Sequence, residues 1–448
     1  MAVAQAPTDD VANLTIEQAA AMVRRKRLSP VELTRRCLAR IEKLNPKLNA
    51  FITVTPGRAM AEASEREAEQ MRGRVRGPLH GIPIGIKDLF DTAQVRTTAA
   101  SALFADRVPD RDAEVVARLR LAGAVIVGKC NMDEFAYNFT GETSHFGTCR
   151  NPWKPTHTPG GSSGGSAVAV AARMCLGAVG SDTGGSIRLP AAFCGIVGLK
   201  PTYGLVPLTG AMPLAWSMDH AGPMARTVEG AALMLEAMAG SRFPLNAAVK
   251  KMRVGIPRSP FFDKLAPEVQ SAIDEAIRAV GALAGAVVEM KLPEIPPSAI
   301  IRAEALAYHE ATLATGAGKL HAHTLHEIRE GEKVSTTAYA RSIGEMVRLR
   351  ARMADVFRDV DVLLLPTSPG VAFPLDPSRT PDLVYLRNTL PFNVLGIPVV
   401  SVPCGFSRGG LPMGMQLCGP AGGEAGLLSM ARAYELAAGL VGRPGPPD

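Results

Sequence analysis

The stretch between residues 77 and 227 constrains the fold of this chain more than any other part of the sequence. It is rich in Gly, Ser, Pro and Thr, which favour turns, yet short apolar runs such as residues 124–127 and 167–172 interrupt it. This alternation is typical of buried strands joined by loops that carry functional side chains. We therefore expect the core of an α/β protein here.

The rest of the 448-residue chain is arranged around that core. Sequences that cap helices begin at Thr15 and Ser29, the second with Pro at the first helical position. We expect one α/β domain with a mixed central β-sheet covered by helices on both faces. Its predicted parts are N-terminal helices (1–75), a core that holds the candidate site (76–230), a helical elaboration (240–360) and a return to the core sheet (361–448).

Composition and charge limit the classes of partner. The net charge of +7 is modest for this length, aromatic residues make up only 5%, and no run of five basic residues occurs. The sequence holds neither an apolar run of about 18 residues nor a secretory signal. Seven cysteines without a Cys-x-x-Cys pair are typical of a reduced compartment. We expect a cytoplasmic protein that binds neither nucleic acid nor membranes, with a homodimer left open.

Residues 158–172 surround two adjacent serines, Ser162 and Ser163, with four glycines. The pattern Gly-x-Ser-x-Gly is typical of a nucleophile elbow, but an elbow must follow a strand. The preceding residues 151–159 hold three prolines and cannot form a central strand. A phosphate-binding loop would need a lysine that this segment lacks. On its own the segment also fits a plain flexible loop.

A second cluster, residues 180–195, holds Ser186 directly after the run Thr-Gly-Gly. Such a turn can aim several backbone N–H groups at one point, as an oxyanion hole requires. Asp182 and Arg188 bracket the turn and have opposite charges, so a pair between them would hold it. A purely structural tight turn is the alternative for this segment alone.

A third cluster places Lys87 in an apolar run with Ile82, Ile84 and Ile86. The lysine either extends its ammonium group to solvent from a strand end or is buried. Burial would lower its proton affinity, and a neutral lysine can act as a base.

Together the motifs GIPIGIKD, GGSSGGS and DTGGSIRLP, in this order and spacing, resemble the amidase signature family. The resemblance extends over nearly the whole chain, as far as GLPMGMQLCGP at residues 410–420. It implies that Lys87 is the catalytic lysine, that Ser162 is a bridging serine after a cis peptide bond, and that Ser186 is the nucleophile. The implied oxyanion-hole residues are Thr183, Gly184, Gly185 and Ser186, and the implied supporting residues are Ser163, Asp182 and Arg188.

The chemistry that this resemblance implies is a proton relay. Neutral Lys87 takes the proton of Ser162, and Ser162 takes that of Ser186, which attacks the amide carbonyl and forms an acyl-enzyme. This set needs neither a metal nor a cofactor. His321, His323 and His326 resemble a metal cluster, but no nearby Cys completes it, and we expect a solvated helix end.

The residues after NMDEFA bear on the substrate. The family places substrate-facing residues here, and this chain has Tyr137, Asn138 and Phe139. The A subunit of the glutaminyl/asparaginyl-tRNA amidotransferase, which hydrolyses glutamine for a partner, usually has small Ser-type residues here and Gln in place of Leu189. We therefore expect a free-standing amidase for small apolar or aryl amides, with carbamates (a urethanase activity) and esters left open.

Three alternatives remain open. One is the A subunit of the amidotransferase, and a remote one is an α/β-hydrolase-type esterase. The third is a binding protein without catalytic activity. Tyr137 and Phe139 fit core packing nearly as well as a substrate pocket. The expected partner is a small-molecule substrate.

Overall fold

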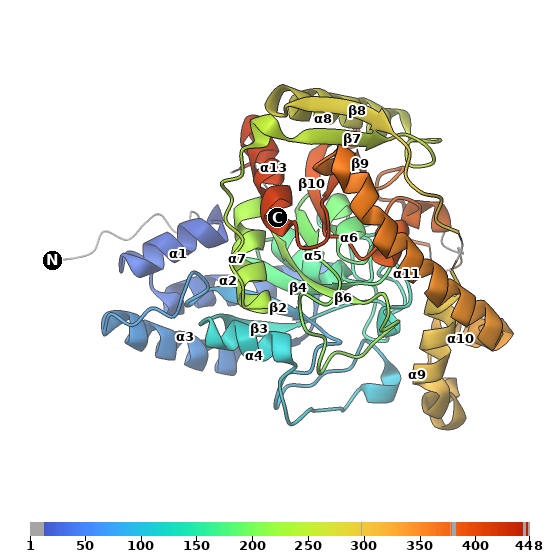
Figure 1. The fold of residues 1–448 in the computed structure, drawn as a ribbon. Coiled ribbons are helices and arrows are strands. Elements are labelled where there is room, and N and C mark those ends of the chain that lie inside the picture. The colour runs from blue at the N-terminus through green and yellow to red at the C-terminus, as the bar shows by residue number, and fades with distance from the viewer. Residues whose placement is uncertain (1–12, 297, 377, 379–381, 442–444, 447–448) are drawn as a thin grey trace.

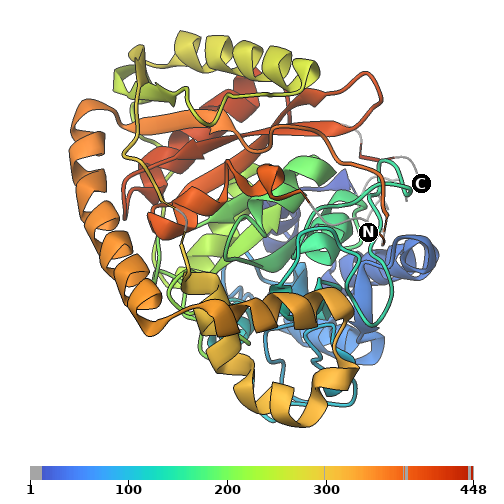
Figure 2. The same ribbon diagram turned by 90° about the vertical axis from the view of Figure 1, so that its right-hand side faces the viewer.

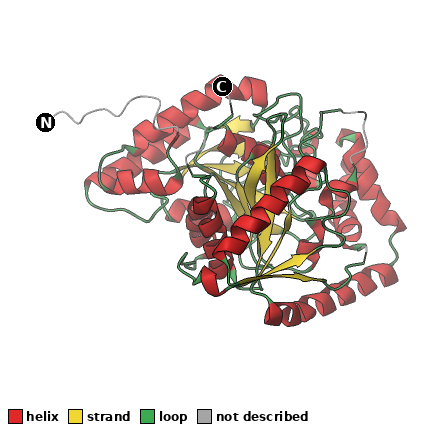
Figure 3. Ribbon diagram, turned by 90° about the horizontal axis from the view of Figure 1, so that it is seen from above, coloured by secondary structure: helices red, strands yellow, loops and turns green. Residues whose placement is uncertain are grey.

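The computed structural model describes residues 13–296, 298–376, 378, 382–441 and 445–446. Within these residues an 11-stranded sheet crosses the molecule in the order β1-β3-β2-β4-β6-β5-β10-β11-β9-β7-β8. Helices cover both of its faces (Figures 1 and 3). The predicted α/β domain with a mixed sheet between helices is therefore confirmed.

The strands at the two ends of the sheet include parallel pairs, whereas those in the middle are antiparallel. β2 lies parallel to β3 and β4, and β7 lies parallel to β8 and β9. The strands are β1 (Phe51–Val54), β2 (Pro83–Lys87), β3 (Val125–Cys130), β4 (Gly177–Asp182), β5 (Val197–Lys200), β6 (His220–Ala225), β7 (Arg253–Pro257), β8 (Ala286–Met290), β9 (Val362–Pro366), β10 (Val399–Phe406) and β11 (Pro412–Cys418). Residues 240–360 thus supply two strands to the sheet besides their helices.

The first two helices begin where the sequence predicts caps. Thr15 and Gln18 form a complete capping box, whereas Ser29 accepts from the N–H of Glu32, whose side chain pairs with arginines instead. Figure 2 shows α9, α10 and α11 along one side of the sheet. The helices are α1 (Ile16–Arg24), α2 (Pro30–Leu48), α3 (Pro56–Met71), α4 (Glu114–Leu121), α5 (Gly164–Ala171), α6 (Arg188–Cys194), α7 (Val228–Ala239), α8 (Pro267–Leu283), α9 (Ile300–Gly316), α10 (Ala322–Arg329), α11 (Thr336–Asp359), α12 (Leu390–Val394) and α13 (Glu424–Ala437).

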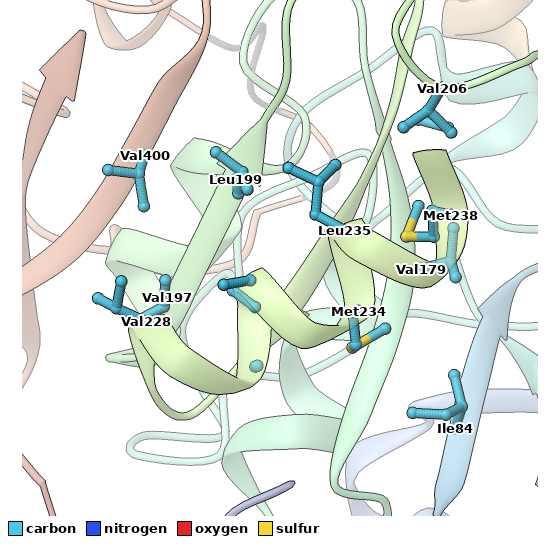
Figure 4. Close-up of a cluster of buried hydrophobic side chains, with 14 of the residues drawn as sticks. Ile84, Val179, Val197, Leu199, Val206, Val228, Met234, Leu235, Met238 and Val400 are labelled. Atoms are coloured by element: carbon cyan, nitrogen blue, oxygen red, sulfur yellow. The ribbon is translucent and has the colours of Figure 1, made fainter. Parts of the chain in front are cut away.

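Two helices fix β4 from opposite faces. On one face α5 buries all eight of its small residues, and on the other α7 packs Met234 and Leu235 toward β4 and β5 (Figure 4). Burying one such large apolar side chain contributes roughly 1.5–3 kcal/mol. Because β2 and β4 are parallel neighbours, their carboxyl ends, Lys87 and Asp182, lie at the same edge of the sheet. None of the described helices has the length and apolar character needed to span a membrane.

Candidate active site

Lys87 ends β2 with its side chain completely buried. Its Nζ donates to the Oγ of Ser162 at 2.7 Å and to the Oγ of Ser181 at 2.8 Å. Burial lowers the pKa of Lys87 to about 7, although nearby carboxylates, Asp133 first among them, raise it. Of the two expectations for this lysine, the structure shows the buried one. A substantial fraction of the amine is therefore neutral near pH 7.

Ser162 follows a cis peptide bond from Gly161, as the resemblance implies. Its side chain is fully buried, so its hydroxyl proton is shielded from bulk water. A Cβ at Gly161 would collide with the carboxylate of Asp133 and the backbone of Phe139, so this position requires glycine. The neighbouring Ser163 exchanges two hydrogen bonds with the backbone of Ser181 and fixes the loop to β4.

Ser186 lies just before α6 and is 8% exposed, so its hydroxyl reaches a cavity while its backbone is held from behind. Its carbonyl accepts the N–H of Ser163 at 3.1 Å, which joins the two serine loops. The turn before it is braced from both sides. Thr183 donates its hydroxyl to Asp219 at 2.5 Å, and the hydroxyl of Thr389 donates to the carbonyl of Gly184 at 2.7 Å.

A buried ion pair organises this turn. Arg188 Nη2 lies 2.9 Å from Asp182 Oδ1, and both side chains are fully buried. Burial opposes ionisation of Asp182, but Arg188 outweighs it and holds the pKa of the carboxyl below its usual range. Asp182 also accepts from the N–H groups of Gly185 and Ile187 at 2.9 and 3.1 Å. Gly185 thus departs from the expected oxyanion role, because its N–H is already engaged.

Sequence reasoning missed two partners of this pair. Asn393 accepts from Arg188 at 2.7 Å and donates to Asp182 at 2.8 Å, and Gln416 accepts from Arg188 at 3.3 Å. Both residues come from the C-terminal part of the chain, more than 200 residues from Arg188. Gln416 lies in the segment GLPMGMQLCGP, but nothing in that segment indicates a contact with Arg188. Ser181, the second partner of Lys87, is missed because a single serine in a strand has no pattern of its own.

A cavity of about 220 Å³ opens beside Ser186. The expected substrate residues Tyr137, Asn138 and Phe139 all line it, because the loop bends after Phe135 and Ala136, both with positive φ. Most of the wall is apolar, and its titratable side chains are His323 and Glu327 of α10, besides the phenol of Tyr137. The remaining lining residues are Ala136, Thr183, Gly184, Leu214, Ile301, Leu383, Leu386 and Leu390.

The three histidines of the expected helix end differ in their surroundings. His321 caps α10 by accepting the N–H of His323 at 3.2 Å, and both His321 and His326 are exposed. His323 is half-buried in the cavity wall, which corrects the expectation of a wholly solvated cluster. Among the described residues no group of three or more potential ligands is placed to hold a metal ion.

Comparison with known proteins identifies the family to which this chain belongs. A sequence model of the family described as Amidase matches residues 32–428. The chain belongs to the amidase family. It is accordingly an enzyme of the amidase type, which hydrolyses carbon–nitrogen bonds. Solved structures agree: a crystal structure of an amidase superposes with a TM-score of 0.88 at 34% identity, covering 94% of this chain and 99% of the other.

The curated relatives of this amidase carry a more specific name. The A subunit of glutamyl-tRNA(Gln) amidotransferase from Geobacter sp. (strain M21) is 39% identical, over 95% of this chain and 97% of its own. The same protein of Thermosynechococcus vestitus is 41% identical, over 92% and 95%. The crystal structure of its counterpart from Thermotoga maritima has a TM-score of 0.78 at 33% identity, with 95% of each chain covered.

These relatives correct the sequence prediction. The expectation of a free-standing amidase for apolar or aryl amides, with only a small molecule as partner, is wrong, because the similar curated proteins are subunits of a tRNA amidotransferase. The residues behind that expectation have a local explanation. Phe139 and Leu189 pack in one buried cluster with Phe193 and Phe373, so they are one packing arrangement and not two independent marks of substrate class.

Proposed function

We propose that this amidase hydrolyses the side-chain amide of glutamine as the A subunit of a glutamyl-tRNA(Gln) amidotransferase. The observation that carries the proposal is the 39–41% identity to proteins of that name over 92–95% of the chain. The buried contact between Lys87 and Ser162, together with Ser186 at the cavity, supports the chemical step.

In the proposed mechanism neutral Lys87 draws the proton of Ser162, and Ser162 draws that of Ser186 as its Oγ attacks the amide carbonyl. The backbone N–H groups of Thr183, Gly184 and Ser186 stabilise the developing oxyanion. The proton returns through Ser162 to the leaving nitrogen, and ammonia departs. Water then cleaves the γ-glutamyl ester of Ser186 by the same relay, so glutamate and free enzyme result. No step calls for a metal or a cofactor.

Glutamine protection tests the substrate directly. A fluorophosphonate reacts with activated serines and should add its mass to the peptide that contains Ser186, but not in Ser186→Ala. Saturating L-glutamine should slow this labelling, and ammonia should be released in step with glutamate. If acetamide is cleaved while glutamine neither protects Ser186 nor releases ammonia, the glutamine proposal is wrong.

The assembly is tested separately. The complex purified through a tag on this chain should convert glutamate attached to tRNA(Gln) into glutamine when L-glutamine and ATP are supplied, because the glutamate carboxylate must be activated before ammonia can displace its oxygen. The same complex with Ser186→Ala should lose the reaction with glutamine but keep it with added ammonium chloride, because ammonia replaces the missing hydrolysis. A wild-type complex that transfers nothing would contradict the proposed place in the amidotransferase while leaving glutamine hydrolysis by the chain intact.

Carbamate cleavage belongs to the same proposal as a side activity. A carbamate has a carbonyl that Ser186 can attack in the same way, and the cavity wall is largely apolar. We expect a chromogenic carbamate to be turned over more slowly than glutamine. Faster turnover of the carbamate at matched concentrations would assign the site to carbamates instead.

A further inference from the structure

The cavity beside Ser186 has one polar wall, and helix α10 provides it. His323 and Glu327 stand four residues apart, so they share one face of the helix, and both line the cavity. α10 packs against α9 at the edge of the molecule (Figures 1 and 2). Glu327 belongs to none of the motifs, His323 belongs only to the histidine group expected at a helix end, and the proton relay uses neither.

Tyr137 adds an unsatisfied hydroxyl to this wall. The residue is 9% exposed and lines the cavity, yet its Oη has no hydrogen-bond partner among the described residues. A buried hydroxyl without a hydrogen-bond partner destabilises the protein, so a bound molecule that supplies a partner gains affinity. Ile301 of α9 and Glu327 of α10 line the same cavity as Tyr137, so this hydroxyl belongs to the same part of the wall.

The carboxylate of Glu327 is the charge that this wall presents to the cavity. Arg302 of α9 lies 4.0 Å from it, at the outer limit of an ion pair, and does not line the cavity. Glu327 is 26% exposed, so it is partly desolvated and attracts a cation more strongly than a free surface carboxylate. Burial lowers the pKa of His323, although Glu327 opposes the shift, so this imidazole adds little positive charge at pH 7.

We infer that Glu327, with Tyr137 and His323 beside it, forms a subsite for the ammonium group of the substrate. The substrate class is then an amide that carries a cationic amine, and glutamine belongs to it. The carboxylate of Glu327 accepts N–H hydrogen bonds from the ammonium group of the substrate. In glutamine the hydroxyl of Tyr137 donates to the substrate carboxylate next to that ammonium group. That the substrate is glutamine rests on the proposed function. That the site prefers an amide with a cationic amine does not.

Glu327→Gln tests the charge with little change of shape. With this variant, KM for L-glutamine should rise about 10-fold or more, because a hydrogen bond to a charged group contributes roughly 1.5–3 kcal/mol. KM for glutaramate, the same amide without the amino group, should rise much less, so the ratio of KM for glutamine to KM for glutaramate measures the loss of ammonium recognition. The matched control is Glu332→Gln, which removes an exposed carboxylate outside the cavity and should alter none of these values.

Four outcomes separate the inference from the proposed function. If wild-type hydrolyses glutamine and Glu327→Gln leaves its KM unchanged, the subsite is wrong and the function stands. An equal rise for glutamine and glutaramate likewise overturns ammonium recognition. If glutamine is not hydrolysed, the pair 4-aminobutyramide and butyramide decides. A preference for the cationic amide that Glu327→Gln abolishes supports the subsite alone, whereas the absence of such a preference overturns it.

Tyr137→Phe provides a second variant in case Glu327→Gln does not fold. It keeps the ring and removes only the unpartnered hydroxyl. KM for glutamine should rise several-fold more than KM for butyramide, since butyramide has no carboxylate to receive the hydrogen bond. Equal KM values for wild-type and Tyr137→Phe on glutamine would contradict the arrangement.

Discussion

The two sides of the cavity differ in how far their polar side chains are buried and hydrogen-bonded. On the catalytic side, Lys87 and Ser162 are fully buried and hydrogen-bonded to each other, and Asp182 and Arg188 pair beneath the turn. On the α10 side the polar side chains are half-buried, and the hydroxyl of Tyr137 has no partner among the described residues. A satisfied, buried network has one stable arrangement, whereas an unsatisfied group can still be satisfied by a ligand. The catalytic side is therefore suited to carry out the same reaction on any bound amide, whereas the α10 side is suited to select which amide binds.

Removing the proposed nucleophile should have the largest effect. Ser186→Ala should lower kcat for glutamine by about 10⁴-fold or more, since the acyl-enzyme cannot form and only binding and oxyanion stabilisation remain. The melting temperature should change little, because one small hydroxyl at the cavity surface is lost. Steady-state ammonia release with a melting curve measures both. Residual activity above about 1% of wild-type would show that another residue attacks.

Lys87→Ala comes next, because it removes the base but leaves the nucleophile. Positioned acid–base groups supply typically 10²–10⁴-fold, and kcat should fall by that factor. The buried Lys129 offers a control: its ammonium pairs with Asp88 away from the serines, so Lys129→Ala should lower stability while the surviving folded enzyme keeps its kcat. The relay would be refuted by a Lys87→Ala enzyme that keeps more than about a tenth of the wild-type kcat.

Asp182→Asn tests whether the catalytic side depends on its buried charge pair. The substitution leaves Arg188 charged and unpaired in a dry interior, which should cost about 3–5 kcal/mol of unfolding free energy. The half-exposed pair of Arg253 and Asp361 is the comparison, and Asp361→Asn should cost no more than about 1 kcal/mol. Urea denaturation of the two variants measures the contrast. Equal losses would mean that burial does not set the strength of these pairs.

The pH profile tests the state of the lysine without any substitution. Burial lowers the pKa of Lys87 to about 7, and only the neutral amine accepts a proton. The neutral fraction grows as pH rises through this value, so kcat/KM should climb from acid pH and level off above about pH 8. Below pH 7 it should fall about tenfold for each pH unit. A profile that is flat from pH 5 to 9 would exclude Lys87 as the base.

Tyr137→Ala should have the smallest effect and addresses the other side of the cavity. Loss of the ring should lower kcat/KM for glutamine more than for acetamide, by roughly 1–3 kcal/mol, because acetamide does not reach the far wall. The melting temperature should fall as well, because the ring is 9% exposed and packs in the main hydrophobic core. The substrate ranking is therefore the deciding measurement. If glutamine and acetamide lose equally, Tyr137 acts only in packing and the two sides do not differ as described.

The sequence predicts the residues that lie in short motifs and misses those that join the site through contacts between distant parts of the chain. Lys87, Ser162 and Ser186 lie in short runs whose glycines and apolar neighbours indicate an unusual backbone, and the sheet follows from the same runs. Asn393 and Gln416 complete the site through contacts across more than 200 residues, and an isolated amide side chain has no pattern that reveals such a contact. Glu327 of α10 was not predicted because it sits in an ordinary polar helix, and His323 was expected at a solvated helix end although it lines the cavity.

The sequence predicts the wrong subfamily for a related reason. The aromatic side chains after NMDEFA suggest substrate contacts, but a sequence does not show that Phe139 also packs in one cluster with Leu189. Side chains that serve the cavity and the core at once respond to changes in either. Their identity is therefore a poor guide to the molecule that binds.

The long-range contact of Asn393 has a consequence for synthesis. All three proposed catalytic residues lie in the first 200 residues, yet Asn393 and Thr389 brace Asp182 and Gly184 from the far end of the chain. Because chains fold from the N-terminus as the ribosome releases them, the nucleophile emerges long before the turn around it is supported. A nascent chain paused before residue 389 would carry every proposed catalytic residue in an unsupported turn. Amide hydrolysis would therefore begin only when translation is nearly complete, and truncated chains would not hydrolyse glutamine.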